Sequence, residues 1–375
     1  MSELSPPFEP PRRILMGPGP SEVSPRVLLA MARPTVGHLD PAFLSLMDEV
    51  SGQLRQLFGT RNSFTVPISG TGSAGMEAAI VNLVEPGDTA IIGVHGVFGQ
   101  RMVAVAERAG ASVVAVEAAW GEPLDMGQLI DAHREHPEAR LLAVVHAETS
   151  TGVLQPLEEL GDYLRGTGTL FVVDTVTSLG GIPVEVDAWG IDVAYSGTQK
   201  CLSVPPGLSP ITLSERALER VRTRNRKVQS WYLDLSLIGA YWGGERVYHH
   251  TAPVNALYGL HEGLRAVFEE GLAARYDRHR RLGRLLQDGL MAKGLELLVA
   301  EPYRLPQLTS VRVPAGVDDR GIRRGLLERF GIEIGGGLGP LVGKIWRVGL
   351  MGATCRVDVV SLFLKALDDL LMGEE

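Results

Sequence analysis

The chain has 375 residues, of which 45% are hydrophobic and 21% charged, and its formal net charge is −8 at pH 7. This length predicts a large domain with a smaller one, and the negative charge argues against a nucleic-acid partner. No apolar run approaches the ~20 residues that a membrane helix requires, so no membrane association is expected. Two cysteines are too few for a disulfide framework, which fits a reducing compartment.

The first residues are rich in proline and include Glu3 and Glu9, unlike the apolar core of a signal peptide or an acid-poor transit peptide. The sequence ends at Glu375 without the peroxisomal Ser-Lys-Leu signal. We therefore expect a cytoplasmic protein.

The middle of the chain alternates short apolar runs with amphipathic helical stretches, which is typical of repeated βα units. The predicted strands are short and rich in Val and Ile, as expected of strands covered on both faces. They span residues 65–68, 89–94, 112–116, 141–146, 170–174, 193–196 and 208–213. The predicted helices between them span residues 74–84, 100–109, 126–136, 156–165 and 214–223. This pattern predicts an α/β fold with a mainly parallel seven-stranded sheet between helices.

From about residue 254 the pattern changes, and a smaller α+β domain is expected. A long helical stretch through residue 290 comes first, and the remaining predicted elements are a strand at 308–313, a helix at 320–330 and a strand at 344–349. The predicted division is an N-terminal extension at residues 1–20, a large domain at 21–270 and a small C-terminal domain at 271–375.

Lys200 follows a predicted buried strand in a loop of small polar residues. The carboxyl ends of the strands, where this loop lies, form the edge of an open α/β sheet at which ligands bind. A desolvated lysine has a depressed pKa and can attack a carbonyl carbon, as a Schiff base with pyridoxal 5′-phosphate (PLP) requires. An ion pair with a nearby carboxylate is the alternative for this lysine taken alone.

Asp174 ends the predicted strand at 170–174, so its carboxylate lies at the same edge of the sheet. A PLP enzyme needs an acid that keeps the pyridine nitrogen protonated. Taken alone, Asp174 could equally cap a following helix. An acid and a lysine that end nearby strands of one sheet favour the cofactor interpretation.

Residues 69–73, Ser-Gly-Thr-Gly-Ser, follow the first predicted strand and open a helix. Free backbone amides, hydroxyl groups and the positive end of a helix dipole suit a phosphate group. With Gly75 the segment also matches GxGxxG, the fingerprint of a dinucleotide site. The next strand ends in Gly-Val-His-Gly at residues 93–96, without the acid that binds a ribose, so the dinucleotide interpretation lacks its second half.

Other residues could complete a cofactor and substrate site. Phe98 could stack on a flat ring or belong to the core. Thr149 or Ser150 could donate a hydrogen bond to a ring oxygen or cap a turn. Arg347 interrupts an apolar strand of the small domain, where it could bind a carboxylate with two parallel hydrogen bonds or form a surface ion pair.

Three histidines raise the question of a metal site. His146 and the pair His249-His250 lack the i, i+4 spacing or the partner carboxylates of a zinc site. We therefore expect structural roles for them and no metal.

Eight ordered segments resemble those of a class V, fold-type I aminotransferase, close to the alanine–glyoxylate and serine–pyruvate (serine–glyoxylate) enzymes. They are residues 17–21, 69–73, 148–152, 173–181, 196–200, 248–251, 335–339 and 346–349. The resemblance covers nearly the whole chain. It implies the fold of the PLP-dependent transferases of type I, with PLP as cofactor.

The resemblance also implies roles for the residues around the cofactor ring and the substrate. Lys200 would form the Schiff base, Asp174 would hold the pyridinium nitrogen, and Thr149 would contact the ring oxygen. Phe98 stands where some relatives carry the stacking Trp. Arg347 would bind the substrate carboxylate.

The phosphate site, by the same resemblance, has two parts. The residues from the same chain would be Thr71, Gly72, Ser73 and Gln199. Tyr248 and Thr251 would reach the phosphate of the neighbouring subunit, so a homodimer with shared active sites is expected.

These features predict ping-pong transamination, in which alanine or serine gives its amino group to glyoxylate or pyruvate. A 2-aminoethylphosphonate–pyruvate transaminase is the first alternative. A cysteine desulfurase is less favoured, because neither Cys201 nor Cys355 has the context of a catalytic loop. An NAD-dependent dehydrogenase would rest on the GxGxxG match alone, and a non-catalytic binding protein is the last alternative, because fold alone does not determine function.

Overall fold

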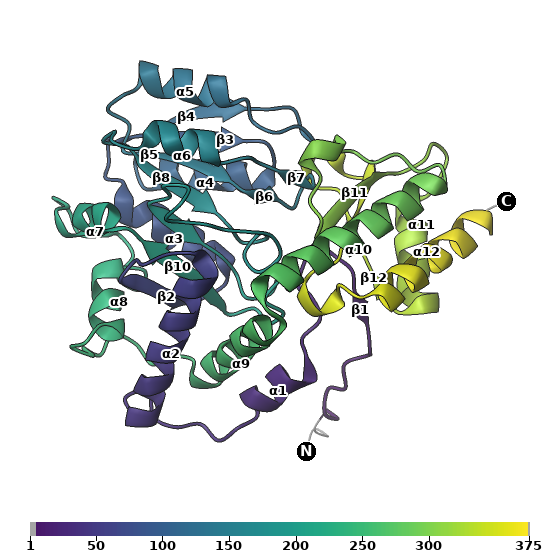
Figure 1. Ribbon diagram of the computed structural model, residues 1–375, viewed down its shortest axis with the longest axis horizontal. Coiled ribbons are helices and arrows are strands. Elements are labelled where there is room, and N and C mark those ends of the chain that lie inside the picture. The colour runs from purple at the N-terminus through teal and green to yellow at the C-terminus, as the bar shows by residue number, and fades with distance from the viewer. Residues whose placement is uncertain (1–4, 374–375) are drawn as a thin grey trace.

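The computed structural model describes residues 5–373 of the chain (Figure 1). Residues 1–4 of the predicted N-terminal extension and residues 374–375 of the predicted small domain lie outside this range. None of the described helices is both long and apolar enough to span a lipid bilayer.

The central sheet of the described chain has seven strands in the order β2-β10-β9-β8-β5-β3-β4. They are β2 (Phe64–Ser69), β3 (Thr89–Val94), β4 (Ser112–Glu117), β5 (Leu141–Val145), β8 (Leu170–Asp174), β9 (Val193–Tyr195) and β10 (Leu208–Leu213). Strand β10 runs antiparallel to both of its neighbours, and the other adjacent strands run parallel. The predicted mainly parallel seven-stranded sheet is confirmed.

Strands β5 and β8 lie side by side in the interior of the sheet and are buried at every residue. Their sequences, LLAVV and LFVVD, are apolar at consecutive positions because both faces are covered. The register pairs Asp174, at the end of β8, with Tyr195 of β9 and with Val145 of β5. The sheet therefore brings the loops after these three strands to one edge.

The helices α3 (Gly72–Leu83) and α4 (Val97–Arg108) pack against each other and against the sheet. The predicted start of α4 at residue 100 is wrong, and Phe98 lies in the first turn of α4 instead of the preceding loop. The amide of Phe98 donates to Glu148 Oε2 at 3.1 Å, which satisfies a helix-start N–H group from a distant part of the chain.

Most of the other predicted helices have close counterparts. They are α5 (Met126–Glu135), α6 (Glu158–Leu164) and α7 (Glu215–Arg222) in the large domain and α11 (Asp319–Phe330) in the small one. The stretch predicted as one helical pattern contains two helices, α9 (Val254–Glu270) and α10 (Leu272–Ala292), because Gly271 adopts a φ of 82° between them.

The prediction omitted α1 (Pro25–Met31), α2 (Pro41–Phe58), α8 (Leu235–Trp242) and α12 (Val357–Met372). Helix α8 has the sequence LSLIGAYW, whose apolar residues show no period that distinguishes a buried helix from a buried strand. Helix α2 was overlooked although its sequence has a typical N-cap residue, Asp40. The Asp40 side chain accepts a hydrogen bond from the Ala42 amide at 2.8 Å and caps the helix.

A second, antiparallel sheet lies in the C-terminal part, with the strand order β11-β14-β13. These strands are β11 (Leu308–Arg312), β13 (Gly335–Gly336) and β14 (Ile345–Gly349). Figure 1 shows β11 grouped with α10, α11 and α12 to one side of the large sheet. The largest buried hydrophobic cluster runs from Val27 to Val267, and the second contains Met16 and residues from 282 to 370. This division of the core fits the boundary expected near residue 270, which stays a prediction.

Residues 14–21, here called the N-terminal segment, attach to the small domain. Strand β1 (Ile14–Leu15) pairs in parallel with β12 (Ile332–Glu333). The Gly349 amide, at the end of β14, donates to the Met16 carbonyl oxygen at 2.7 Å. The N-terminal segment is thus fixed next to the strand that carries Arg347.

Gly99 allows α4 to approach β3 closely, because an added Cβ would lie 2.8 Å from the Gly93 carbonyl oxygen and 2.9 Å from Val94 Cα. No side-chain rotation can relieve contacts with backbone atoms, so we expect Gly99→Ala to lower the free energy of unfolding by about 1–3 kcal/mol. As control, Gly52→Ala in the more open α2 should raise it by about 0.5–1 kcal/mol. Urea denaturation measures both variants, and wild-type stability of Gly99→Ala would contradict the close approach.

Candidate active site

Lys200 lies just after β9 and is only 8% exposed. Its Nζ donates a hydrogen bond to the Pro18 carbonyl oxygen, and no carboxylate of the described residues forms an ion pair with it. Burial lowers the pKa of the Lys200 amine from 10.5 to about 8, and the Arg347 guanidinium contributes in the same direction. The ion-pair alternative therefore does not describe this lysine, whose neutral form is a nucleophile.

The N-terminal segment forms one wall of the site around Lys200. The Ser21 amide donates to the Gln199 carbonyl oxygen at 2.8 Å, and the Ser21 hydroxyl donates to the Lys200 carbonyl oxygen at 2.6 Å. Gly19, at a φ of 112°, lies against the lysine side chain, since a Cβ at this position would be 2.6 Å from Nζ. Sequence reasoning gave these residues only as part of a family motif, and their contact with Lys200 was missed.

Asp174 is 2% exposed, and among the described residues only one of its carboxylate oxygens has a hydrogen-bond partner, although the Tyr195 hydroxyl lies close enough to lower its pKa. Oδ1 accepts a hydrogen bond from the Val176 amide at 2.8 Å, while Oδ2 is buried without a partner among the described residues. Burial raises the pKa of this carboxyl group from 3.8 to about 7. The next helix in the chain is α7, beyond two further strands, so Asp174 is not a helix cap. The free oxygen suits a ligand with a cationic N–H group.

Arg347 reaches the site from β14 and is 7% exposed. Its Nε donates to the Gly336 carbonyl oxygen at 2.7 Å, and its Nη1 donates to the Thr149 carbonyl oxygen at 3.0 Å. Among the described residues Nη2 makes no hydrogen bond, and Gly335 lies beside it, since a Cβ on this residue would be 3.5 Å from Nη2. Burial lowers the pKa of Arg347 to about 10, so it stays charged near neutral pH. A fixed guanidinium with a free edge can bind a carboxylate, whereas a surface ion pair is not observed.

Glu148 is a completely buried carboxylate that sequence reasoning left without a role. Its Oε1 accepts hydrogen bonds from the Ser150 hydroxyl at 2.6 Å and the Ser150 amide at 3.0 Å, and its Oε2 accepts from the Phe98 amide. Burial raises the pKa of Glu148, and these hydrogen bonds oppose the rise. Because Ser150 is engaged by Glu148, Thr149 is the better candidate of the two for contact with a ligand ring. Glu148 also fixes the turn of α4 that carries Phe98.

The N-terminus of α3 lies at the same edge of the sheet. Thr71 precedes the helix without a side-chain cap, and Gly72 and Ser73 form its first turn. A Cβ on Gly72 would lie 3.2 Å from Val176 Cγ2 and 3.6 Å from the Ser196 carbonyl oxygen, so this turn touches the loops after β8 and β9. Free amides and the positive end of the helix dipole make this turn suitable for a phosphate group.

Tyr248 and Thr251 are the predicted site residues that the single chain does not connect to the others. Tyr248 is 57% exposed, and its ring centroid lies 5.2 Å from that of His38. Thr251 is also exposed. Between them, His250 Nε2 lies 2.8 Å from Ser69 Oγ, so this segment runs beside the phosphate-suited turn of its own chain.

The remaining nucleophile and metal candidates have ordinary surroundings. Cys201 and Cys355 are both fully buried, and burial raises their thiol pKa values to about 12 and about 11. Neither thiol is therefore readily ionised. Within residues 5–373, no group of three or more His, Cys, Asp or Glu side chains is placed to hold a metal ion.

Comparison with known proteins places these observations in context. The family model described as aminotransferase class-V matches residues 23–362. The solved structure of an alanine–glyoxylate aminotransferase from Nostoc sp. is 52% identical, covers 98% of each chain and superposes with a TM-score of 0.96. The (S)-ureidoglycine–glyoxylate transaminase of Bacillus subtilis is 42% identical over 96% of this chain and 91% of its own. An alanine–glyoxylate aminotransferase of Drosophila melanogaster is 41% identical over 99% of this chain and 95% of its own.

Asp174 should make the stability of the ligand-free chain depend on pH. Because its pKa rises from 3.8 to about 7 on folding, the folded chain holds a proton that the unfolded chain has lost between these values. This contribution to stability is complete below pH 3.8 and is lost as the pH rises to about 7, by at most about 1.4 kcal/mol per pH unit.

Replacement of Asp174 with Asn should remove this contribution, as urea unfolding at a series of pH values will show. Asp131→Asn, on an exposed position of α5, is the control and should keep the wild-type pH dependence. An identical slope in Asp174→Asn and wild type would mean that the carboxyl pKa is not raised.

Proposed function

The chain belongs to the class V aminotransferases, and on this premise we propose that it transfers the amino group of alanine or serine to glyoxylate. Enzymes of this family depend on PLP, and the chain is a PLP-dependent aminotransferase. Glyoxylate is the acceptor in the names of the similar enzymes from Nostoc sp., Bacillus subtilis and Drosophila melanogaster. The buried Arg347 with its free guanidinium edge, close enough to lower the pKa of Lys200, is the observation that carries the proposal.

The described residues fit PLP. The partnerless Asp174 Oδ2 would accept a hydrogen bond from the protonated ring nitrogen, and Lys200 Nζ would bond the aldehyde carbon. The first turn of α3 would bind the phosphate through the residues Thr71, Gly72 and Ser73, together with Gln199 from the loop after β9. When bound, PLP supplies an electron sink for the negative charge that develops at the substrate Cα.

The chain's own groups then divide the work of transamination. Arg347 orients first the carboxylate of the amino donor and then that of glyoxylate, because two of its nitrogens are fixed on backbone carbonyls. Lys200 would be the general base: its free amine would accept the proton from the donor Cα and pass it to C4′ of the cofactor, and with glyoxylate it would move a proton in the opposite direction. Phe98, fixed through Glu148, would stack on the ring, and Thr149 would contact the ring oxygen.

One comparison adds (S)-ureidoglycine as a second candidate for the amino donor. The Bacillus subtilis relative, 42% identical over almost the whole chain, is named for (S)-ureidoglycine. This donor has the same carboxylate for Arg347 and differs from alanine in its polar side chain. By contrast, 2-aminoethylphosphonate has no carboxylate for Arg347, and the comparisons do not favour it.

A homodimer with shared active sites is part of the proposal. Large side chains are exposed around Tyr248, including Trp231 at 61% and Val247 at 51% exposure. The contact between His250 and Ser69 puts this exposed surface beside the phosphate-binding turn. A second copy of the chain that covers it would bring Tyr248 and Thr251 to the partner's site. The domain division at residue 270 and the cytoplasmic location stay predictions.

A panel of amino donors with glyoxylate tests the reaction. We expect glycine formation from alanine or serine, an absorbance band of Lys200-bound cofactor in the purified protein, and loss of both in Lys200→Ala. Because Lys200 has both a general-base and a covalent role, we expect kcat of Lys200→Ala to fall about 1,000-fold or more.

Inclusion of (S)-ureidoglycine and 2-aminoethylphosphonate identifies the donor class. Preference for (S)-ureidoglycine would reassign the donor and keep the acceptor, whereas activity with 2-aminoethylphosphonate and pyruvate alone would contradict the proposal. Arg356→Ala, on the surface of the small domain, serves as a control for unspecific loss of activity.

Mixing two inactive variants tests the shared site. A Lys200→Ala chain retains Tyr248 and Thr251, and a Tyr248→Ala, Thr251→Ala chain retains Lys200. After subunit exchange, each mixed dimer would contain one complete site, so we expect roughly a quarter of wild-type activity to return. Each variant exchanged with itself is the control, and no recovery in mixed dimers, verified by differently tagged chains, would contradict sharing.

A further inference from the structure

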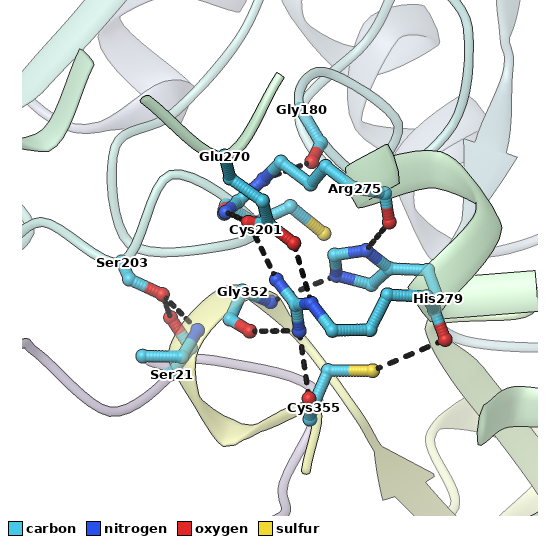
Figure 2. A network of polar contacts seen from close by, with 11 residues as sticks. Ser21, Gly180, Cys201, Ser203, Glu270, Arg275, His279, Gly352 and Cys355 are labelled. Atoms are coloured by element: carbon cyan, nitrogen blue, oxygen red, sulfur yellow. Dashed lines mark hydrogen bonds and ion pairs between the residues drawn. The ribbon is translucent and has the colours of Figure 1, made fainter. Parts of the chain in front are cut away.

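Arg275 contacts the backbone that carries Lys200. It lies in the first turn of α10 and is 5% exposed. Its Nε donates to the Gly180 carbonyl oxygen at 2.8 Å, and its Nη2 donates to the carbonyl oxygen of Cys201, the residue after Lys200. Figure 2 shows the Arg275 side chain reaching toward Gly180, Cys201 and Glu270. One buried side chain therefore joins the loops that follow β8 and β9.

Glu270 holds Arg275 in this orientation. Arg275 Nη1 donates to Glu270 Oε2 at 2.6 Å, and Glu270 Oε1 accepts a hydrogen bond from Arg278 Nε, also at 2.6 Å. Arg278 Nη1 in turn donates to the Gly352 carbonyl oxygen at 3.0 Å and to the Cys355 carbonyl oxygen at 2.7 Å. Charge-assisted hydrogen bonds of this kind fix both partners. Near the start of α10, Arg275 thus binds the loops after β8 and β9, and Arg278 binds the segment that contains Gly352 and Cys355.

His279 closes the network on the other side. Its Nδ1 donates to the Arg275 carbonyl oxygen at 2.8 Å, and its Nε2 accepts from the Gly352 amide at 3.0 Å, which defines the neutral tautomer (Figure 2). Burial lowers the pKa of His279 to about 3, so the ring stays neutral. The Ala353 amide then donates to Ser203 Oγ at 2.8 Å, back in the loop of Lys200.

We propose that Arg275 is a positioning residue for Lys200, which acts through the Gly180 and Cys201 carbonyl groups. The inference rests on the proposed role of Lys200 in binding the cofactor. The hydrogen bonds of Arg275 go to these carbonyls and to Glu270, while Ser21 holds the carbonyl of Lys200 itself. With both successive carbonyls fixed, the lysine side chain leaves the backbone from one defined position and its amine stays in the buried site.

The rate of PLP addition to cofactor-free protein, measured by absorbance as a function of pH, tests this role. In wild type the rate should rise with a midpoint near pH 8, the pKa of the buried amine. In Arg275→Met the amine is less confined and better solvated, so the midpoint should move toward the ordinary lysine pKa of 10.5. Misplacement of the amine should also lower kcat about tenfold or more, with KM for the amino donor within about twofold of wild type.

Two further variants separate positioning from charge and from stability. Arg275→Lys keeps the charge but has one donor atom in place of three, so its midpoint and kcat should lie between those of Arg275→Met and wild type. Arg224→Met is the matched control, because Arg224 Nη1 also donates to two carbonyl oxygens, those of Asn82 and Val84, both at 2.8 Å. This control should lower the melting temperature and leave the midpoint and kcat unchanged.

A wild-type midpoint and kcat in Arg275→Met would overturn the inference. The same changes in Arg224→Met at an equal loss of melting temperature would overturn it as well. If Arg275→Met does not fold, Arg275→Lys against Arg224→Met decides by the same two readouts. Wild-type protein that fails to take up PLP would be recognisable as a failure of the proposed function, because it precedes any comparison of variants.

Discussion

The active site depends on charged side chains that are kept out of water and form no ion pair with any of the described residues. Lys200, Asp174 and Arg347 are each at most 8% exposed, and burial shifts the pKa of each toward the neutral form. Such groups persist only where a well-packed structure holds them, which the buried central sheet and the small domain do together. A ligand with a protonated ring nitrogen and an aldehyde would supply partners for Asp174 and Lys200. A substrate carboxylate would supply the partner for Arg347.

The seven strands of the central sheet were predictable because their physical signal is local. Runs such as LLAVV in β5 are short, rich in Val and apolar at consecutive positions, as expected of strands covered on both faces. The start of α4 was not predictable, because the group that accepts the hydrogen bond of the Phe98 amide is Glu148, 50 residues further along the chain. Helix α8 was not predictable for a different reason, because an apolar octapeptide is compatible with a strand as well as a helix.

The site itself was predictable where chemistry and position coincide. Asp174 ends an apolar strand, Lys200 follows one in a loop of small polar residues, and Arg347 interrupts one, so each stands out in the sequence. Arg275 and Ser21 do not stand out in the sequence, because they donate hydrogen bonds to backbone carbonyl groups, which occur at every position of every chain. Tyr248 and Thr251 came only from the family resemblance, since the pattern of one chain carries no signal for the contact with a second subunit that is proposed for them.

The attachment of the N-terminal segment has a consequence for how the protein is made. Residues 14–21 leave the ribosome long before their partners in β12 and at Gly349 are synthesised. The large sheet can assemble from strands that emerge before residue 214, as domains generally do during synthesis. Gly19 and Ser21 can therefore take their positions beside Lys200 only after β12 and β14 have been synthesised. We therefore expect a nascent chain to bind the cofactor only after it has been translated through Gly349.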